Sequence, residues 1–371
     1  MKGPLISIDD MTAAYPKVDA KAMGLLKNLV DDCLHERGKC SNFRELSRDE
    51  TLPSSPLLPR RVIDVGDTSN VLLRIHESGN DERAGYTTLS HRWGNKLTFK
   101  TTMENIERLR EKIDFDALPL SFRNAITVTR AMDVRYLWID AMYIIQDNHS
   151  DWLEQAPLMG KIYKNSQCTF AAHSAEDSTV GFLESSAASL RPVPFAPESS
   201  GDNSLIHPRS IQQALEKGIC IGIPHTFKQS IDFSHIKKRG WVVQELTLSP
   251  TVAHSDGYIY WDCEHTTMLR SVAHKAEPSI QSRVVMKKIG TGINFVESWI
   301  NLVTEYSKCD LTFGTDKLFA ISGIAAEWQK HLEEGVGRQY HAGVFGCTLP
   351  QALLWYRTRK TLTRFQERAP S

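Results

Sequence analysis

Three segments of this 371-residue chain place residue types suited to ligand chemistry beside predicted secondary structure. In the first, Ser90, Arg92 and Trp93 follow a predicted strand over residues 86–90, and open α/β sheets bind their ligands at the carboxyl ends of strands. Arg92 offers a fork of donors for a phosphate or carboxylate, and Trp93 offers a stacking face. The same segment can instead be a structural turn, with Trp93 in the core and Gly94 in an unusual backbone conformation.

The other two segments each contribute a carboxylate. Asp140 ends the apolar run 135–140, where it can bind a ligand or cap the following turn. Trp241 and Glu245 lie four residues apart in a predicted helix over 239–248 and share one of its faces. A stacking indole beside a carboxylate that accepts hydrogen bonds from ribose hydroxyls is a reasonable sugar or nucleotide site. The alternative is a Trp in the core and a solvated Glu at the rim of the helix.

Common site motifs of other kinds are absent from the sequence. It has no P-loop, no GxGxxG after a strand, and no GxSxG, HExxH or CxxC, which argues against a Rossmann or P-loop nucleotide site. Cys33, His35 and Cys40 have a metal-like spacing but no second pair of zinc ligands, so we interpret them as packing a helix end and expect no metal. A thiol hydrolase built on Cys168 and His173 is a weaker alternative, because Cys168 falls in an apparent core strand.

The elements that must position these residues alternate between short apolar runs and amphipathic helices. Strands are expected over 61–64, 71–75, 86–90, 135–140, 168–172 and 258–263, a long loop over 174–203, and ordered structure of no stated type over 218–223. Helices are expected over 20–33, 121–132, 239–248, 295–306, 316–329 and 349–358, and another starts near Asp151 and is kinked or restarted by Pro157. We expect Ser121 and Asp151 to cap their helices. This order predicts an α/β fold, a mainly parallel sheet flanked by helices, followed by a mostly helical C-terminal region.

Composition limits the functional classes. Lys and Arg number 44 and Asp and Glu number 44, so the net charge of zero argues against nucleic-acid binding by bulk charge. No apolar run approaches the roughly 18 residues of a membrane span, and the first ten residues do not resemble a secretory signal. Seven scattered cysteines fit free thiols in a reducing compartment. We therefore expect a cytoplasmic protein with no membrane span.

The segments that carry these residues resemble, in order, the blocks of the fungal heterokaryon incompatibility (HET) domain. Residues 86–94, 118–147 and 239–250 resemble its successive blocks, and residues 306–325 resemble the region that commonly follows the domain. Linked blocks in order are more specific than a single motif. The chain departs from the family pattern at Ala141, Met142 and Tyr143 after the strand-end Asp, and at Thr251, where an Arg is usual.

The resemblance implies three parts: a helical preface and linker over 1–60, a HET domain over 61–265, and a helical C-terminal region over 266–371 that is shorter than in similar proteins. It implies a role in self/non-self recognition and in the programmed cell death that follows fusion of genetically different fungal cells. The implied partner is a second copy of the chain or another incompatibility protein.

HET domains are similar in outline to Toll/interleukin-1 receptor (TIR) domains, some of which cleave NAD. By that analogy, the candidate catalytic residue is Glu245, and the candidate ligand-binding residues are Ser90, Arg92, Trp93, Asp140 and Trp241. NAD would then be a substrate, and no bound cofactor is expected. The competing interpretation is a non-catalytic signalling module that recruits a death-triggering partner.

Overall fold

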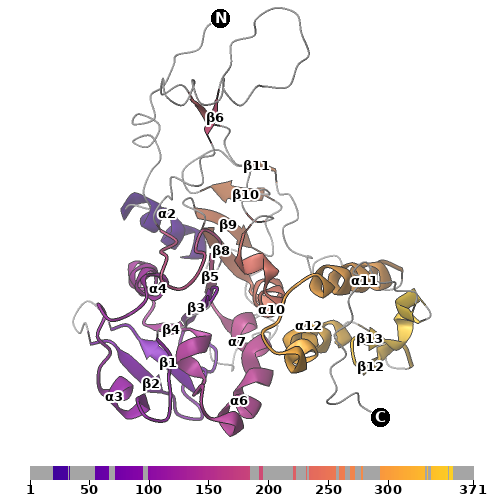
Figure 1. Ribbon diagram of the computed structural model, residues 1–371, viewed down its shortest axis with the longest axis horizontal. Coiled ribbons are helices and arrows are strands. Elements are labelled where there is room, and N and C mark those ends of the chain that lie inside the picture. Colours follow the sequence, from indigo (N-terminus) through magenta and orange to yellow (C-terminus); the bar gives the residue numbers. More distant parts are fainter. Residues whose placement is uncertain are drawn as a thin grey trace, which may run out of the picture.

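The computed structural model describes residues 20–31, 33, 55–66, 72–94, 99–183, 192–194, 220–222, 231, 234–255, 259–263, 268–271, 277–278, 293–330, 332, 336–349 and 351–353. A nine-stranded sheet in the order β11-β10-β9-β8-β5-β3-β4-β1-β2 crosses the molecule (Figure 1). Its strands are β1 (Arg61–Asp64), β2 (Arg74–Glu77), β3 (Tyr86–Ser90), β4 (Tyr136–Trp138), β5 (Cys168–Ala172), β8 (Thr251–Ser255), β9 (Ile259–Cys263), β10 (Met268–Ser271) and β11 (Glu277–Pro278).

The centre of the sheet is parallel. β3 pairs in parallel with both β4 and β5, and β5 pairs in parallel with β8. Antiparallel strands continue the sheet on both sides, β1 and β2 beyond β4 and β9 to β11 beyond β8. The expected α/β fold is confirmed, and three of the predicted strands, β4, β3 and β5, lie side by side at its centre.

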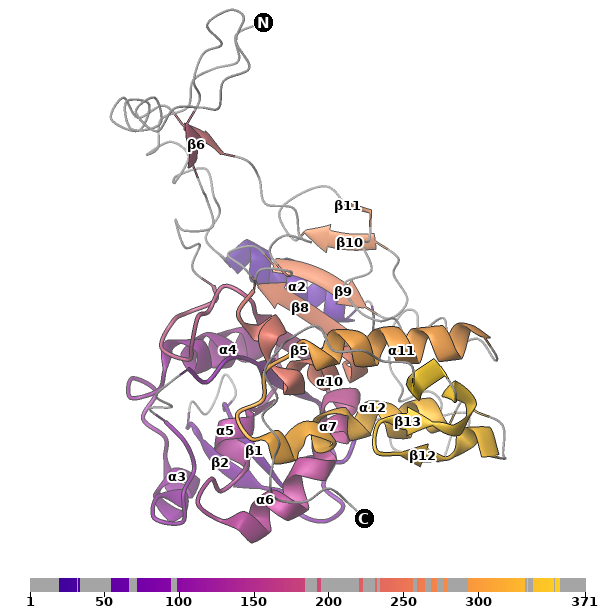
Figure 2. The same ribbon diagram turned by 45° about the vertical axis from the view of Figure 1, so that its right-hand side comes forward.

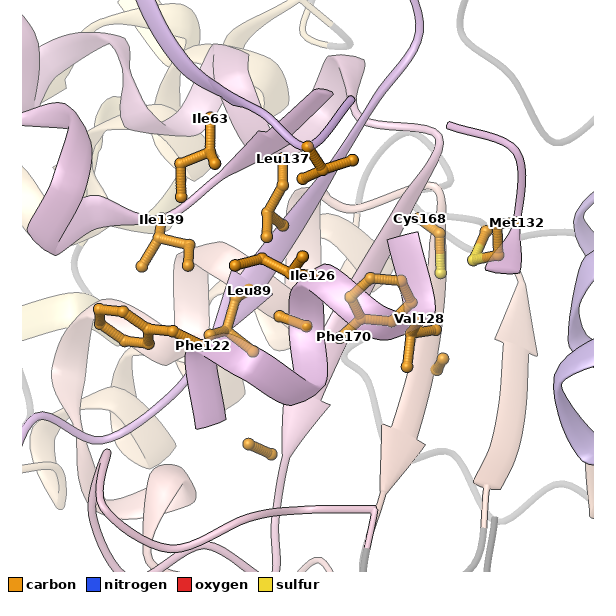
Figure 3. Close-up of a cluster of buried hydrophobic side chains, with 14 of the residues drawn as sticks. Ile63, Leu89, Phe122, Ile126, Val128, Met132, Leu137, Ile139, Cys168 and Phe170 are labelled. Carbon is orange, nitrogen blue, oxygen red and sulfur yellow. The ribbon is translucent and has the colours of Figure 1, made fainter. Parts of the chain in front are cut away.

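Helices cover both faces of the sheet and make three layers, as expected from strands whose two faces are both apolar. One face packs against α2 (Ala20–Asp31) and α4 (Leu120–Ala131). Figure 3 shows this core, where Leu89, Leu137 and Phe170 of the strands meet Phe122 and Ile126 of α4. The other face carries α7 (Met159–Asn165) and α10 (Gly240–Leu248).

Because successive side chains on a strand point to opposite faces, β3 and β4 also contribute to the second core. Tyr86 and Trp138 lie there with Tyr143 and Tyr163, and the Trp138 ring is 5.2 Å from the Tyr143 ring and 5.3 Å from the Tyr163 ring, centroid to centroid. Ser90, at the end of β3, therefore belongs to the face covered by α7 and α10. The short helices α3 (Ile106–Glu111), α5 (Asp140–Tyr143) and α6 (His149–Gln155) complete this part of the chain.

The C-terminal region is mostly helical, as predicted. It contains α11 (Ile293–Ser307), the 3₁₀ turn η7 (Gly314–Lys317), α12 (Phe319–Gln329) and a short hairpin of β12 (Tyr340–His341) and β13 (Val344–Phe345). Its core is aromatic, with Phe295, Trp299, Trp328 and Phe345 all buried. Figure 2 shows α12 lying against α10 and α7, so this region packs on the helices of the second face.

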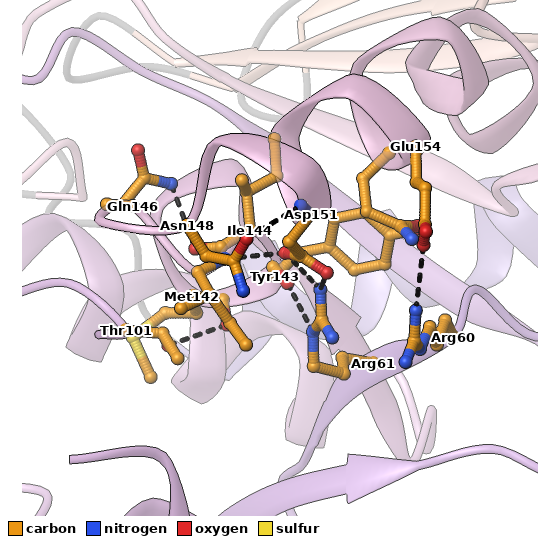
Figure 4. Close-up of polar contacts among 12 residues, drawn as sticks. Arg60, Arg61, Thr101, Met142, Tyr143, Ile144, Gln146, Asn148, Asp151 and Glu154 are labelled. Atoms are coloured by element: carbon orange, nitrogen blue, oxygen red, sulfur yellow. Dashed lines mark hydrogen bonds and ion pairs between the residues drawn. The ribbon is translucent and has the colours of Figure 1, made fainter. Parts of the chain in front are cut away.

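Two predicted helix caps are wrong because each side chain has a stronger tertiary partner. Ser121 lies inside the first turn of α4, and its hydroxyl donates to the Val180 carbonyl at 2.5 Å. α6 is capped by Asn148, whose side-chain oxygen accepts the Asp151 N–H. Asp151 instead binds Arg61 of β1, as Figure 4 shows. Pro157 restarts the helix as predicted, in the 3₁₀ turn η3 (Ala156–Leu158) that precedes α7.

Several predicted boundaries also change. The second strand covers 74–77 rather than 71–75, because its register pairs Arg74 with Asp64, the last residue of β1, and Glu77 with Arg61, the first. The long loop contains β6 (Pro192–Pro194), which pairs with β7 (Cys220–Gly222). The central strand β8 was not predicted. Of the expected helix over 349–358, the structure describes only a 3₁₀ turn, η10 (Gln351–Leu353). His35 and Cys40 of the metal-like spacing lie outside the described residues.

Candidate functional site

Two neighbouring parallel strands bring the predicted strand-end residues together. Ser90 is the last residue of β3, and Asp140 follows β4 as the first residue of α5. The indole N–H of Trp93 donates to Asp140 Oδ2 at 2.8 Å, and Asp140 Oδ1 accepts the N–H of Ala141 at the same distance. Asp140 thus bonds within its own turn and anchors Trp93, while its role as a ligand-binding group stays a prediction.

α10 adds Glu245 to the same place. This side chain is 1% exposed, so it is not a solvated residue at the helix rim. The hydroxyls of Ser90 and Tyr163 lie close enough to favour its charged form, yet neither carboxylate oxygen has a hydrogen-bond partner among the described residues. The Tyr163 hydroxyl donates to the Leu89 carbonyl at 3.2 Å instead. A buried carboxylate without hydrogen bonds is costly and calls for a functional explanation.

Burial dominates the electrostatics of Glu245. Loss of hydration raises the pKa of its carboxyl from 4.5 to about 7, the Arg239 guanidinium opposes this rise, and the Asp140 carboxylate adds to it. A carboxyl with a pKa close to neutrality can exist in either protonation state under cellular conditions, which suits acid–base or charge-stabilising work.

Arg239 is the cation of the cluster. Its guanidinium donates to the His91 carbonyl and lies 3.7 Å from Asp140 Oδ2. His91 is buried, its Nδ1 is 3.8 Å from Asp140 Oδ1, and its ring packs edge-on against Phe122. Burial lowers the pKa of His91 to about 4, so the imidazole is neutral at pH 7. The charges near Glu245 are therefore the buried Asp140 carboxylate and the partly buried Arg239 guanidinium.

Two of the predicted site residues have their main contacts elsewhere. Arg92 is partly exposed, and its guanidinium donates to the Glu176 carbonyl at 3.4 Å. The indole N–H of Trp241 donates to Asp316 Oδ2 at 3.3 Å, which directs this ring toward the C-terminal region. Trp93, half-buried and bonded to Asp140, is the indole that lies in the acid cluster.

The turn that carries Trp93 is built as the alternative interpretation of this segment expected. Gly94 has a φ of 81°, the left-handed region that favours glycine. A Cβ atom there would also lie 2.5 Å from Asp177 Cβ. Ser178 donates to the carbonyls of Arg92 and Trp93 at 3.2 and 3.3 Å. The loop is thus a structural turn, and it carries the Trp93 indole that bonds Asp140.

A second polar cluster occupies the ends of β5 and β8. His173 Nε2 is 2.8 Å from His254 Nδ1, and His173 Nδ1 is 2.9 Å from Ser234 Oγ. Both ring nitrogens of His173 are therefore engaged, and neither serves Cys168, whose Sγ lies 3.8 Å from the Thr169 carbonyl. These contacts of His173 argue against the thiol-hydrolase alternative. Within the described residues, no group of three or more His, Cys, Asp or Glu side chains is placed to hold a metal ion.

Sequence reasoning did not select Arg239, His91 or Tyr163 as site residues. His91 and Arg239 lie inside two of the segments that the sequence analysis selected. Their titratable ring and charged guanidinium could have identified them as candidates. Tyr163 had no signal, because a Tyr on an apolar helix face looks like any core residue.

The fold and the cluster define an α/β protein with two buried carboxylates and a partly buried arginine at the carboxyl ends of its parallel strands. Residues 86–245 match the family model described as heterokaryon incompatibility protein (HET). This segment is a HET domain, which confirms the resemblance inferred from the sequence, and it contains every member of the cluster. The match supports a role in heterokaryon incompatibility. No curated protein and no solved structure matched the chain.

The helices of the described residues are all too short or too polar to cross a bilayer.

Proposed function

We propose that the HET domain triggers incompatibility-linked cell death by cleaving NAD at the Glu245 cluster. The observation that carries this proposal is the buried Glu245 carboxylate, whose pKa is raised to about 7 although the Ser90 and Tyr163 hydroxyls and the Arg239 guanidinium lie close enough to lower it. Structural carboxylates in a core are normally paired or hydrogen-bonded. A buried carboxylate that forms no ion pair within 4 Å in the part of the chain that the structure describes, and whose pKa is raised toward neutrality, fits a group that meets its partner only when a ligand is bound.

Hydrolysis of NAD breaks the bond between ribose C1′ and the nicotinamide nitrogen, and the electron pair leaves with nicotinamide. Water adds to C1′ and releases one proton, which gives ADP-ribose. Positive charge develops on the ribose, as in glycoside hydrolysis, and the leaving group needs no strong acid because its ring is already cationic. Ionised Glu245 would stabilise that charge and orient the ribose hydroxyls.

The other residues would have supporting roles. Trp93, held by Asp140 at 2.8 Å, would offer its face to a ring of the substrate. Arg239 favours the charged form of Glu245, and Arg92, partly exposed on the loop after β3, would hold a phosphate. Ser90, buried beside Glu245, would contact the ribose. The proposed setting is the cytoplasm, and self-association would act as the switch.

The test uses purified protein incubated with NAD and chromatographic detection of nicotinamide. The parent should release nicotinamide, and Glu245→Gln, which keeps the size and removes the charge, should fold and release none. Glu104→Gln, at an exposed position, is the matched control and should behave like the parent. Overexpression of the same three proteins in cells, with cellular NAD measured, links the chemistry to killing.

The second candidate function is a recruitment module without catalysis. It is favoured by exposed apolar side chains near the start of α12, where Phe313 is 65% and Leu318 45% exposed. A folded Glu245→Gln protein that kills as well as the parent would reject the enzymatic proposal and leave this one.

A further inference from the structure

α10 lies between the sheet and the C-terminal region, and its two sides have different partners. The side that carries Glu245 faces the end of β3, as described above. The other side contacts α12 and α7, and Leu248 at its end belongs to the aromatic core of the C-terminal region. Since a helix rotates as a unit, any contact that fixes the outer side also fixes where Glu245 points.

The tightest outer contact involves the residue next to Glu245. Gln244 is buried, and its Oε1 accepts the backbone N–H of Gly323 in α12 at 2.8 Å. A Cβ atom on Gly323 would lie 2.5 Å from Gln244 Oε1 and 3.0 Å from the Cα atom of Gly160 in α7. Three helices thus meet at two glycines and one amide, with no room for a methyl group unless something shifts.

The first turn of α10 is held separately by the segment between α11 and α12. The N–H of Gly240 donates to the Asp310 carbonyl at 2.9 Å, and the N–H of Asp310 donates to the Lys238 carbonyl at 2.6 Å. Trp241 adds its bond to Asp316. Both ends and the middle of this helix are therefore fixed by residues that follow it in the chain.

We propose that Gln244 and Gly323 are positioning residues, which hold α10 in the rotation that places Glu245 against Ser90, and that the C-terminal region is thereby part of the site. The catalytic consequence of this positioning rests on the proposed function. Its structural content, the control of α10 by α12, stands independently. It follows that a change in α12, which does not contact Ser90, alters the surroundings of Glu245.

Two variants disturb the contact by different means. Gly323→Ala inserts a methyl group into the junction, and Gln244→Met keeps the length of the side chain but removes the acceptor. Gly24→Ala in α2 is the matched helix control, because a Cβ there would meet no atom within 4 Å. Ile75→Val in β2, a buried change far from α10, controls for general loss of stability.

Hydrogen exchange of the α10 amides and the ionisation of Glu245 are the two readouts. In both variants, exchange within 240–248 should rise about tenfold over the parent while that of β3 and β5 is kept. The carboxyl resonance of Glu245, assigned with Glu245→Gln, should titrate below the pH of about 7 expected for the parent, because a rotated helix admits water. If the protein releases nicotinamide, the decline of this activity at low pH should shift to the same lower pH as the titration of Glu245.

Three results would overturn the proposal. They are exchange in α10 that matches Gly24→Ala, exchange that rises evenly over the chain as in Ile75→Val, and an unchanged titration of Glu245. If the parent releases no nicotinamide, the proposed function fails, but exchange and titration still decide the role of Gln244 and Gly323.

Discussion

Glu245 illustrates, at the scale of single residues, the conflict between a reactive group and a stable core. Its pKa is about 7 in the folded chain and 4.5 in a solvated one. The folded state therefore binds a proton more tightly, and stability falls as pH rises between these two values. Above pH 7 the folded state carries the full cost of a buried charge, about 3 kcal/mol.

We predict that Glu245→Gln stabilises the protein in a pH-dependent way. Its free energy of unfolding should exceed that of the parent by up to about 3 kcal/mol at pH 8, and the two should converge below pH 4.5, where the parent carboxyl becomes protonated in both states. Urea denaturation at the two pH values measures this. A variant less stable than the parent at pH 8 would show that the carboxylate stabilises the fold, which would contradict a cost of burying its charge.

The site residues differ in how far sequence could reveal them. Ser90, Trp93 and Asp140 follow strands, and strand ends of a parallel sheet converge whatever the rest of the fold does. Glu245 needed the orientation of α10, which the Trp241 spacing predicted only in part, since Trp241 bonds Asp316 in the C-terminal region. The partners of a buried charge, such as Arg239 beside Asp140, depend on long-range packing that no local pattern encodes.

At the scale of elements, a buried ion pair links β1 of the sheet to α6 (Figure 4). Arg61 Nη2 lies 2.6 and 2.5 Å from the two Asp151 oxygens, and Arg61 Nε donates to the Tyr143 carbonyl at 2.5 Å. Both side chains are buried. Removal of one partner leaves the other charge buried without a counter-ion, which typically costs 3–5 kcal/mol.

We therefore predict that Arg61→Met and Asp151→Asn each lower the free energy of unfolding by about 3–5 kcal/mol, and that combining them costs less than the sum. Chemical denaturation of the four proteins gives the coupling. Arg60 and Glu154 provide an adjacent control, because their pair at 3.2 Å is more than half exposed. Arg60→Met should stay within about 1 kcal/mol of the parent. Additive losses for the Arg61 and Asp151 variants would mean that the pair is not coupled.

The Trp138 side chain packs β4 against the helices on the second face of the sheet. Its ring is fully buried between Tyr143 and Tyr163, so Trp138→Ala should cost about 3–5 kcal/mol and abolish activity through misfolding. Trp138→Phe, which keeps an aromatic ring, should lose less. Thermal unfolding of both variants checks this. Wild-type thermal stability in Trp138→Ala would contradict the burial argument.

The features that the sequence did not predict correctly depend on tertiary contacts. β8 reads Thr-Val-Ala-His-Ser, so it lacks the apolar run that marks a buried strand, and its place beside β5 comes from tertiary pairing. The caps at Ser121 and Asp151 followed local rules, and each side chain took a distant partner instead. Long periodic segments such as α4 and α11 were predicted because their own pattern determines them.

At the scale of the whole molecule, the HET domain and the C-terminal region share α10. Val242 of this helix packs with the sheet through Val252 and Ala171, and Leu248 packs with Trp299 and its neighbours. An element with both sides buried in different cores couples their unfolding, since neither core can lose it without exposing apolar surface. The two regions should then behave as one cooperative unit.

We predict that a core change in the C-terminal region destabilises the HET domain too. Trp328 is fully buried, 5.2 Å from the Trp299 ring and 5.3 Å from the Phe295 ring, and Trp328→Ala should cost about 3–5 kcal/mol. Calorimetry should show one transition at a lower temperature, and hydrogen exchange should quicken in β3 and β5 along with α11 and α12. Leu349→Ala, at a partly exposed position of the same region, is the control and should leave the transition near that of the parent. A separate early transition confined to 293–353, with β3 and β5 as protected as in the parent, would show that the two regions fold independently and that α10 is not the link between them.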